Sequence, residues 1–156
     1  MTLEFDSRGL LRPGIHEAGL DELEIHFGRF QRSSRRASLF AKLRDYLAEL
    51  KSAGWDCEIV IDGSFVMPMV DEPDDIDLIL VLPDGWDLEA DLRPFEYNLV
   101  SKRRVAKAYE VGLAVVLAGS DERRQWVGFF SRVNEKWCQA FGWPIGSTKG
   151  IVRLLQ

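Results

Sequence analysis

The feature that most constrains the fold is a pair of apolar, strand-like segments, residues 57–61 and 75–82, with a polar connection between them. Val, Ile and Leu dominate both segments and turn-forming residues flank them, which predicts two strands. The connection begins with Gly63-Ser64, and after ten further residues the second segment opens with Asp75-Ile76-Asp77. One strand therefore ends in Gly-Ser, and the next begins with Asp-x-Asp.

The two aspartates form a candidate metal site. Side chains alternate across a strand, so Asp75 and Asp77 project to the same face. Two carboxylates held this close repel each other, and both remain ionised when a cation lies between them. Mg²⁺ (or Mn²⁺) suits this position, because Mg²⁺ accepts one or two carboxylates, keeps several waters and completes its shell with substrate phosphates. We therefore expect Asp75 and Asp77 to be the metal ligands and the catalytic carboxylates.

Gly63 and Ser64 form the predicted nucleotide-binding half of the site. Without a side chain at Gly63 a phosphate can approach the backbone closely, and Ser64 adds a hydroxyl and an N–H donor. A helical turn beginning at Ser64 would favour an anion as well. Phosphoryl and nucleotidyl transfer need positioning and charge neutralisation more than a strong protein base, which fits a chain with only two His residues.

Each half of this pattern also has an ordinary structural explanation. Gly and Ser are common in turns that end strands, and the acidic residues 71–77 are typical of a solvated loop. The two halves occur together between apolar strands, however, and Asp77 lies inside a strand, where Asp is depleted. The combination favours a binding site.

The remaining sequence predicts helices and strands around this segment. The clearest predicted helix spans residues 34–53, because Leu recurs at helical spacing, Ser33 or Ser34 can cap it, and Gly54 can end it. The other predicted elements are helices at 21–27, 101–109 and 121–141, a central strand at 113–118, a turn at Pro83-Asp84-Gly85, a last strand or ordered tail at 150–155, and an irregular arm at 1–15 that Leu10, Leu11 and Ile15 could pin to the core.

Composition predicts a single domain spanning residues 1–156. A chain of 156 residues that is 46% hydrophobic and 29% charged suits one compact core. The net charge of −5 argues against broad binding of duplex nucleic acid, but leaves room for a basic patch that faces one RNA or nucleotide. The sequence shows no signal peptide, no membrane span and no metal-ligand spacing of Cys57 and Cys138, so we expect a cytoplasmic protein with reduced thiols and no membrane contact.

The Gly63-Ser64 pair, the ten-residue gap and the Asp75-Ile76-Asp77 motif together resemble the signature of the DNA polymerase beta-like nucleotidyltransferase superfamily. The spacing is similar to that of the minimal nucleotidyltransferases that act as antitoxins beside HEPN-domain toxins. The chain resembles more closely an uncharacterised bacterial group of short nucleotidyltransferase-like proteins. Residues 5–11, 13–16, 62–66, 75–77 and 149–153 carry that resemblance, which touches both ends and the middle of the chain.

The resemblance implies an α+β (α/β) fold, with a nucleotidyltransferase-like mixed sheet and helices packed mainly on one face. It also implies two magnesium ions held by three carboxylates, of which Asp75 and Asp77 match the first two. The third should lie on the strand at 113–118, where Ala114 occupies the aligned position, and its loss weakens one metal in particular. Glu110 and Asp121 flank that strand and could substitute.

Basic and aromatic residues supply further candidates. Lys149 and Arg153 lie in a segment shared with the resembled group, which makes Lys149 a candidate nucleotide ligand and both residues candidate phosphate contacts. Two basic clusters are further candidates, although a solvated surface is the commoner role for such residues. The first could grip phosphate or RNA and consists of Lys102, Arg103, Arg104 and Lys107. The second could face an acidic partner or water and consists of Arg29, Arg32, Arg35 and Arg36. The spacing of Trp126, Phe129, Phe130 and Trp137 is typical of a helix core, with an interface as the alternative.

Two functional hypotheses follow. The first is an active nucleotidyltransferase that moves a nucleotidyl group from a magnesium-bound nucleoside triphosphate to a hydroxyl of a protein, an RNA or a small molecule. The second is a catalytically impaired member that binds nucleotide or a protein partner, such as the toxin of a toxin–antitoxin or phage-defence pair. Ala114 favours the second hypothesis.

Overall fold

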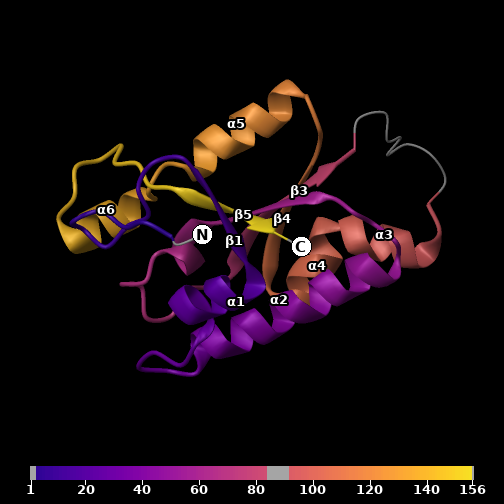
Figure 1. Cartoon of the computed structure of the whole chain (residues 1–156), viewed down its shortest axis with the longest axis horizontal. Helices are drawn as coiled ribbons and strands as arrows, with labels where there is room; N and C mark the ends of the chain where they lie inside the picture. Colours follow the sequence, from indigo (N-terminus) through magenta and orange to yellow (C-terminus); the bar gives the residue numbers. More distant parts are fainter. Residues whose placement is uncertain (1–2, 84–91, 156) are drawn as a thin grey trace.

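The strands of the computed structural model, which describes residues 3–83 and 92–155, form one mixed sheet of five strands (Figure 1). They are β1 (Ile15–Gly19), β2 (Glu58–Asp62), β3 (Ile76–Leu82), β4 (Val111–Leu117) and β5 (Ile151–Leu155). Their order across the sheet is β1-β5-β2-β3-β4. β1 runs parallel to β5, β2 runs antiparallel to β5 and to β3, and β4 runs parallel to β3.

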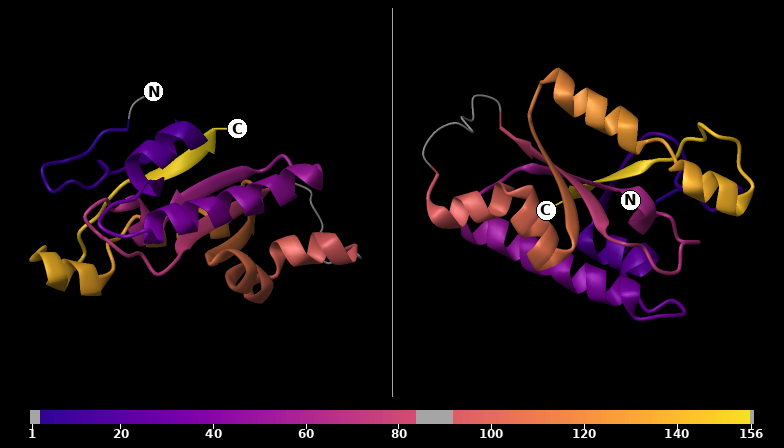
Figure 2. Two further views of the ribbon diagram at one scale, coloured as in Figure 1. Left: turned by 90° about the horizontal axis from the view of Figure 1, so that it is seen from below. Right: turned by 180° about the vertical axis from the view of Figure 1, so that it is seen from behind.

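The helices lie mainly on one face of the sheet (Figures 1 and 2). That face is covered by α1 (Leu20–Leu23), the π-helix η1 (Glu24–Gly28), α2 (Arg35–Ser52), α3 (Pro94–Val100) and α4 (Lys102–Tyr109). α5 (Asp121–Phe130) lies over the opposite face, and α6 (Glu135–Phe141) lies beyond one end of the sheet. The predicted α+β class, with a mixed sheet and helices mainly on one side, is confirmed.

Alternation along the strands gives the sheet two apolar faces. On the face toward α2 and α4, Ile59, Ile61, Leu78 and Leu80 belong to the larger core. On the face toward α5, a smaller core contains Val60, Ile79, Val81, Ala114 and Val116, with Trp126 and Phe130 packed against it. Asp62 pairs with Asp77 and Val60 pairs with Ile79, so by alternation both aspartates belong to the α5 face. The candidate site therefore lies on the face of the sheet that α5 covers, opposite the face that carries most of the helices.

The longest helix forms where its sequence predicts it. α2 begins at Arg35, whose N–H donates to Ser33 Oγ at 3.2 Å. Leu39 and Leu43 are completely buried against the sheet, as their helical spacing requires. Gly54, two residues beyond the helix, has the left-handed φ of +77° that was expected to end it.

The prediction of a central strand at 113–118 was wrong, because β4 is the edge strand of the sheet. Its two faces are nevertheless both covered, since α4 packs on one and α5 on the other. A strand covered on both faces needs apolar side chains throughout, wherever it lies in the sheet. The apolar run therefore indicated that both faces of the strand are covered by helices, and not that the strand is central in the sheet.

The predicted helix at 121–141 is two helices. α5 ends at Phe130, and α6 begins after Asn134, whose side-chain oxygen accepts from the N–H of Lys136 at 2.9 Å. The segment between the helices pairs with the chain ahead of β5: the Val133 N–H donates to Ser147 O and the Lys149 N–H to Ser131 O, both at 2.8 Å. Backbone groups at the break therefore form hydrogen bonds with a distant segment of the chain, and local helical periodicity cannot predict such pairing.

The predicted N-terminal arm is held against the molecule over its described residues. Leu10 and Leu11 are completely buried, as expected, whereas Ile15 is 44% exposed and begins a strand that was not predicted. Of the predicted turn at Pro83-Asp84-Gly85, all but Pro83 lies outside the described residues. Within residues 3–83 and 92–155, every helix is too short or too polar to cross a bilayer. Cys57 and Cys138 are buried and form no disulfide with each other.

Candidate metal and nucleotide site

The five residues predicted to form a site line one cavity. Its volume is about 670 Å³, and it lies where the β2–β3 connection meets the end of α5, the start of α6 and the segment ahead of β5. The predicted residues in its lining are Gly63, Ser64, Asp75, Asp77 and Lys149. Residues separated by more than 80 positions in sequence are thus gathered around one space.

Asp75 and Asp77 converge over Gly112 of the neighbouring strand. Gly112 pairs with Asp77 across β4 and β3. A Cβ placed on Gly112 would lie 2.8 Å from Asp77 Oδ1 and 3.2 Å from Asp75 Oδ2. One oxygen of each carboxylate therefore lies within 3.2 Å of a common point, which is the proximity that alternation along the strand predicts.

Gly63 makes room for the Asp77 carboxylate. Its φ is +79°, which favours glycine, and a Cβ there would overlap Asp77 Oδ2 and lie 2.8 Å from Asp77 Cγ. The expected reason for glycine here was the close approach of a phosphate. The structure adds a different reason: the Asp77 carboxylate occupies the space that a side chain at residue 63 would need. Ser64 follows in the 3₁₀ turn η2 (Gly63–Val66), so the helical turn expected at this point is present.

Burial and mutual repulsion disfavour ionisation of the Asp75 and Asp77 carboxyl groups. Burial, reinforced by Asp75, raises the pKa of Asp77 to about 7. Burial, reinforced by Asp74, also raises the pKa of Asp75, although Arg35 opposes that rise. A divalent cation between the two groups would offset both the repulsion and the loss of hydration.

Lys149 is the buried cation of the site. It is 1% exposed, its Nζ donates to Phe130 O at 2.9 Å, and burial lowers the pKa of its ammonium to about 8 although Asp62 and Asp77 oppose the shift. Burial of an ammonium is costly unless a charge of opposite sign lies near it. Lys149 therefore belongs electrostatically to the aspartate cluster, even though it reaches the cavity from the segment ahead of β5.

Asp62 is the site residue that sequence reasoning missed, because the predicted strand ends at residue 61 and the predicted site begins at Gly63. It is the last residue of β2, it pairs with Asp77, and it is completely buried. Neither of its carboxylate oxygens accepts a hydrogen bond from any described residue. Burial and the nearby Asp77 and Asp75 raise the pKa of Asp62, against the opposing effect of Lys149. An Asp inside a strand is unusual, and that was the available signal.

Strand β4 carries no acid beside Asp77. Ala114, the aligned position of a third carboxylate, pairs with Ile79 and packs in the smaller core, and the residue directly opposite Asp77 is Gly112. Glu110 forms ion pairs with Arg35 at 2.6 Å and with Lys42, and these cations lower the pKa of its carboxyl to about 2. Asp121, the other acid considered as a substitute, lies at the start of α5. Its side chain is 85% exposed and pairs with Arg124 rather than lining the cavity.

Arg36 holds the connection that carries the site. It was predicted to face water or an acidic partner, and that prediction was wrong because Arg36 is completely buried. Its guanidinium donates to the carbonyl oxygens of Phe65 and Met67, both at 2.6 Å, and of Val70 at 2.8 Å. It also donates to Phe27 O at 3.1 Å. One side chain thus ties α2 and η1 to the backbone between Ser64 and Asp75.

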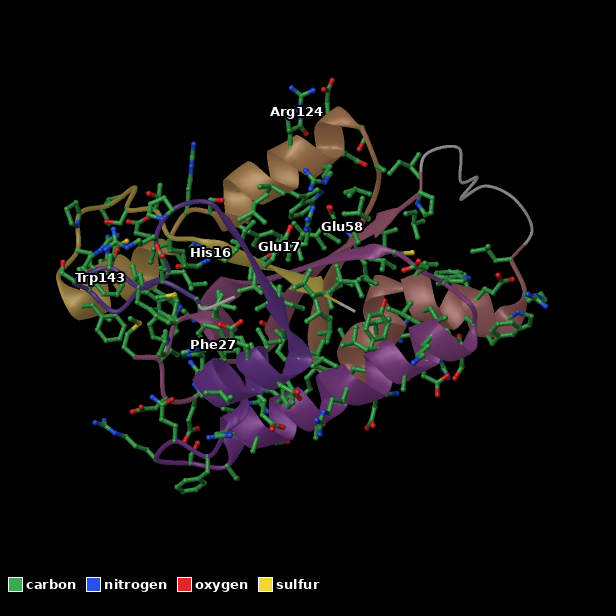
Figure 3. All side chains as sticks on the ribbon, viewed as in Figure 1. His16, Glu17, Phe27, Glu58, Arg124 and Trp143 are labelled. Atoms are coloured by element: carbon green, nitrogen blue, oxygen red, sulfur yellow. The ribbon has the colours of Figure 1, made fainter. Side chains whose placement is uncertain are left out.

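The other basic candidates lie outside the cavity. Arg153 forms ion pairs with Glu17 and Glu58, two residues labelled in Figure 3, rather than reaching the aspartates. The cluster on α4 is exposed, as a solvated surface would be, and none of its members lines the cavity: Lys102, Arg103, Arg104 and Lys107.

The donor set fits a magnesium ion that takes part of its coordination from a substrate. Among the described residues no group of three or more His, Cys, Asp or Glu side chains is arranged to hold a metal. Mg²⁺ does not require such a cage, because one or two carboxylates, waters and phosphate oxygens complete its shell. Asp75, Asp77 and the hydroxyl of Ser64 all offer oxygen atoms, which are the ligand type that Mg²⁺ prefers.

Comparison with known proteins yields a family without an assigned activity. Searches of curated proteins and of solved structures found no match. A model of a family of unknown function, DUF6932, matches residues 3–155, which include the whole candidate site. The chain therefore belongs to the DUF6932 family of unknown function.

Proposed function

We propose that this protein binds a magnesium–nucleoside triphosphate complex in the cavity that Asp75 and Asp77 line. The single observation that carries the proposal is the gathering of two close carboxylates, a Gly-Ser turn and a buried lysine around one space. This arrangement offers negative groups for a cation, and donors and a positive charge for phosphates. The resemblance of the Gly63-Ser64 and Asp75-Ile76-Asp77 pattern to nucleotidyltransferases supports the same ligand.

Each residue has a defined part in the proposed complex. Asp75 and Asp77 would hold the ion, which when bound neutralises phosphate charge. Ser64 would donate a hydrogen bond to a phosphate oxygen, and Lys149 would place its ammonium against the remaining negative charge. Binding of the ion would also ionise Asp77 fully, because a divalent charge favours the carboxylate over the carboxylic acid.

The reaction class proposed for this complex is nucleotidyl transfer. The oxygen of an acceptor hydroxyl bonds to the α-phosphorus, and the bond from that phosphorus to the bridging oxygen breaks. Pyrophosphate leaves with that oxygen, and the hydroxyl proton passes to solvent. A protein, an RNA or a small molecule could supply the hydroxyl. A cytoplasmic location would give the site its nucleotide.

A second candidate function is nucleotide binding without transfer, in a regulatory complex with a protein partner such as a toxin. The observation that favours it is strand β4, where Gly112, opposite Asp77, and Ala114, opposite Ile79, carry no carboxylate. A site with two ligating carboxylates can bind one ion with a triphosphate. Without an acid on β4, such a site holds a second ion less firmly.

The test is transfer of label from each of the four α-labelled nucleoside triphosphates, with Mg²⁺ or Mn²⁺, to the protein itself and to extracts that contain candidate acceptors. The variant Asp77→Asn is the active-site control, and Asp121→Asn, at an exposed position on α5, is the matched one. Transfer lost only in Asp77→Asn supports the enzyme. Metal-dependent binding without transfer selects the second candidate, and absence of metal-dependent binding rejects both.

A further inference from the structure

The cavity that holds the aspartates has a second, apolar wall. It is formed by the end of α5, the start of α6 and the segment ahead of β5, and its large apolar residues are Phe129, Phe130, Trp137 and Ile145. A cavity for an ion and phosphates alone needs no such wall. The volume of about 670 Å³ lies in the range of sites that enclose a whole small organic ligand.

The apolar wall is joined directly to the charged part of the cavity. Lys149 Nζ donates to Phe130 O at 2.9 Å, so the lysine that faces Asp62 and Asp77 also holds the last residue of α5. The Lys149 N–H donates to Ser131 O at 2.8 Å, which fixes the backbone immediately after that helix. Phe129 therefore directly precedes Phe130, the residue whose carbonyl oxygen accepts the hydrogen bond from the Lys149 ammonium.

Two residues of this wall are exposed although they are large and apolar. Phe129 is 63% exposed and Ile145 is 62% exposed. The Phe129 ring is held by edge contacts, with its centroid 5.9 Å from that of Trp126 and 5.3 Å from that of Phe130. Its orientation is thus set by two neighbouring rings while most of its surface remains open to a ligand.

We propose that this wall is a nucleobase subsite, in which the base stacks on Phe129 and contacts Ile145 while the triphosphate extends past Lys149 toward Asp75 and Asp77. The inference rests on the proposed function and adds the part of the ligand that the aspartates do not recognise. Stacking accepts any base, because every base has a π-face, so preference follows stacking strength. Purine nucleotides are therefore expected to bind more tightly than pyrimidine nucleotides.

The test compares a nucleotide with its phosphates alone. Titration calorimetry with Mg²⁺ gives the dissociation constants of ATP and of inorganic tripolyphosphate for the wild type and for Phe129→Ala. Removal of the ring is expected to weaken ATP about tenfold and to leave tripolyphosphate within about twofold, because only ATP has a base to stack. Phe129→Trp should keep ATP affinity, since the larger ring also stacks. The matched control is Phe30→Ala, at a Phe that is 71% exposed and does not line the cavity.

The outcomes separate this inference from the function on which it rests. Equal weakening of both ligands by Phe129→Ala, or no weakening of either, overturns the base subsite and leaves the metal and phosphate site standing. Wild-type affinity for ATP no higher than for tripolyphosphate does the same. Failure of the wild type to bind either ligand in the presence of Mg²⁺ overturns the proposed function, and the subsite with it.

Discussion

At the scale of single residues, the Asp77 carboxylate determines what its neighbours on both sides can be. A side chain at Gly63 would overlap Asp77 Oδ2, and one at Gly112 would come within 2.8 Å of Asp77 Oδ1. The two glycines stand on either side of β3, at the end of β2 and in β4. Glycine at these positions is therefore a condition for the carboxylate to lie where it does.

Substitution of Gly63 tests this condition, and Gly54 offers a matched control. Gly63 has a φ of +79° and Gly54 a φ of +77°, but a Cβ on Gly54 would meet nothing within 4 Å. Both Ala variants should lose about 1 kcal/mol of unfolding free energy to backbone strain. Gly63→Ala should lose more, and should weaken Mn²⁺ binding at least tenfold, because Asp77 must move. Urea denaturation and Mn²⁺ titration measure the two effects; equal losses in both variants and unchanged Mn²⁺ affinity would contradict the assigned contact.

Asp62 shows what sequence reasoning misses at this scale. Its neighbours Gly63 and Ser64 were identified, because their spacing to Asp75 follows a pattern along the chain. The surroundings of Asp62 include Asp77 and Lys149, which come together with it only in the fold. Sequence could therefore locate the segment, but not the carboxylate that lies deepest in it.

At the scale of elements, the connection between β2 and β3 is organised from α2. Arg36 supplies hydrogen bonds to carbonyl oxygens of that connection, and its guanidinium lies 5.5 Å from the centroid of the Phe65 ring. Burial lowers the pKa of Arg36 to about 10, which leaves the side chain protonated at neutral pH. The positions of Ser64 and Asp75 thus depend on one buried cation in a different element.

Replacement of that cation should loosen the connection and the site together. Arg36→Met leaves several buried carbonyl oxygens without donors, so the free energy of unfolding should fall by about 3 kcal/mol or more. Arg36→Lys should recover little of it, because an ammonium cannot reach the same set of oxygens. Arg29→Met is the control at an exposed Arg of the same cluster, with an expected change below about 0.5 kcal/mol. Chemical denaturation measures all three; a Lys variant as stable as the wild type would contradict the role of the guanidinium fork.

Elements with strong local patterns could be predicted, and those that depend on distant pairing could not. α2 and the strands that flank the Gly-Ser and Asp-x-Asp pattern follow from helical spacing and apolar runs. β1 could not be predicted, because Ile15–Gly19 has no alternation and is held by its pairing with β5. The break between α5 and α6 depends likewise on hydrogen bonds to residues 147–149, and the burial of Arg36 depends on carbonyl oxygens from another segment.

At the scale of the whole molecule, the buried charges of the site make stability depend on pH. The pKa of Asp77 is raised to about 7 in the fold, against about 3.9 in an unfolded chain. Between these values the folded state keeps a proton that the unfolded state has lost, so stability falls as pH rises from about 4 to 7. The pKa of Lys149 is lowered to about 8, so the unfolded state holds the extra proton above pH 8 and stability rises again toward pH 10.

The metal-free protein should therefore be least stable between about pH 7 and 8. Urea denaturation from pH 5 to 9.5 in the presence of a chelator measures this profile. Asp77→Asn should remove about 2 kcal/mol of the fall between pH 5 and 7. Addition of Mg²⁺ at pH 8 should recover stability in the wild type and not in the variant. A profile that rises steadily from pH 5 to 8 in the metal-free wild type would show that Asp77 is not held near a neutral pKa.

The most direct test of the metal–nucleotide site is thermal unfolding of the wild type and of the double variant Asp75→Asn, Asp77→Asn, each with Mg²⁺, a nucleoside triphosphate, both or neither. A ligand that binds only the folded state, at a hundred times its dissociation constant, adds about 2.7 kcal/mol. For a chain of 156 residues this raises the Tm by about 5–10 °C. We predict that rise in the wild type when Mg²⁺ and nucleotide are present together, and its absence in the double variant. An unchanged wild-type Tm with all four nucleotides, or the same rise in both proteins, would contradict the assignment of Asp75 and Asp77 as the metal ligands of a nucleotide site.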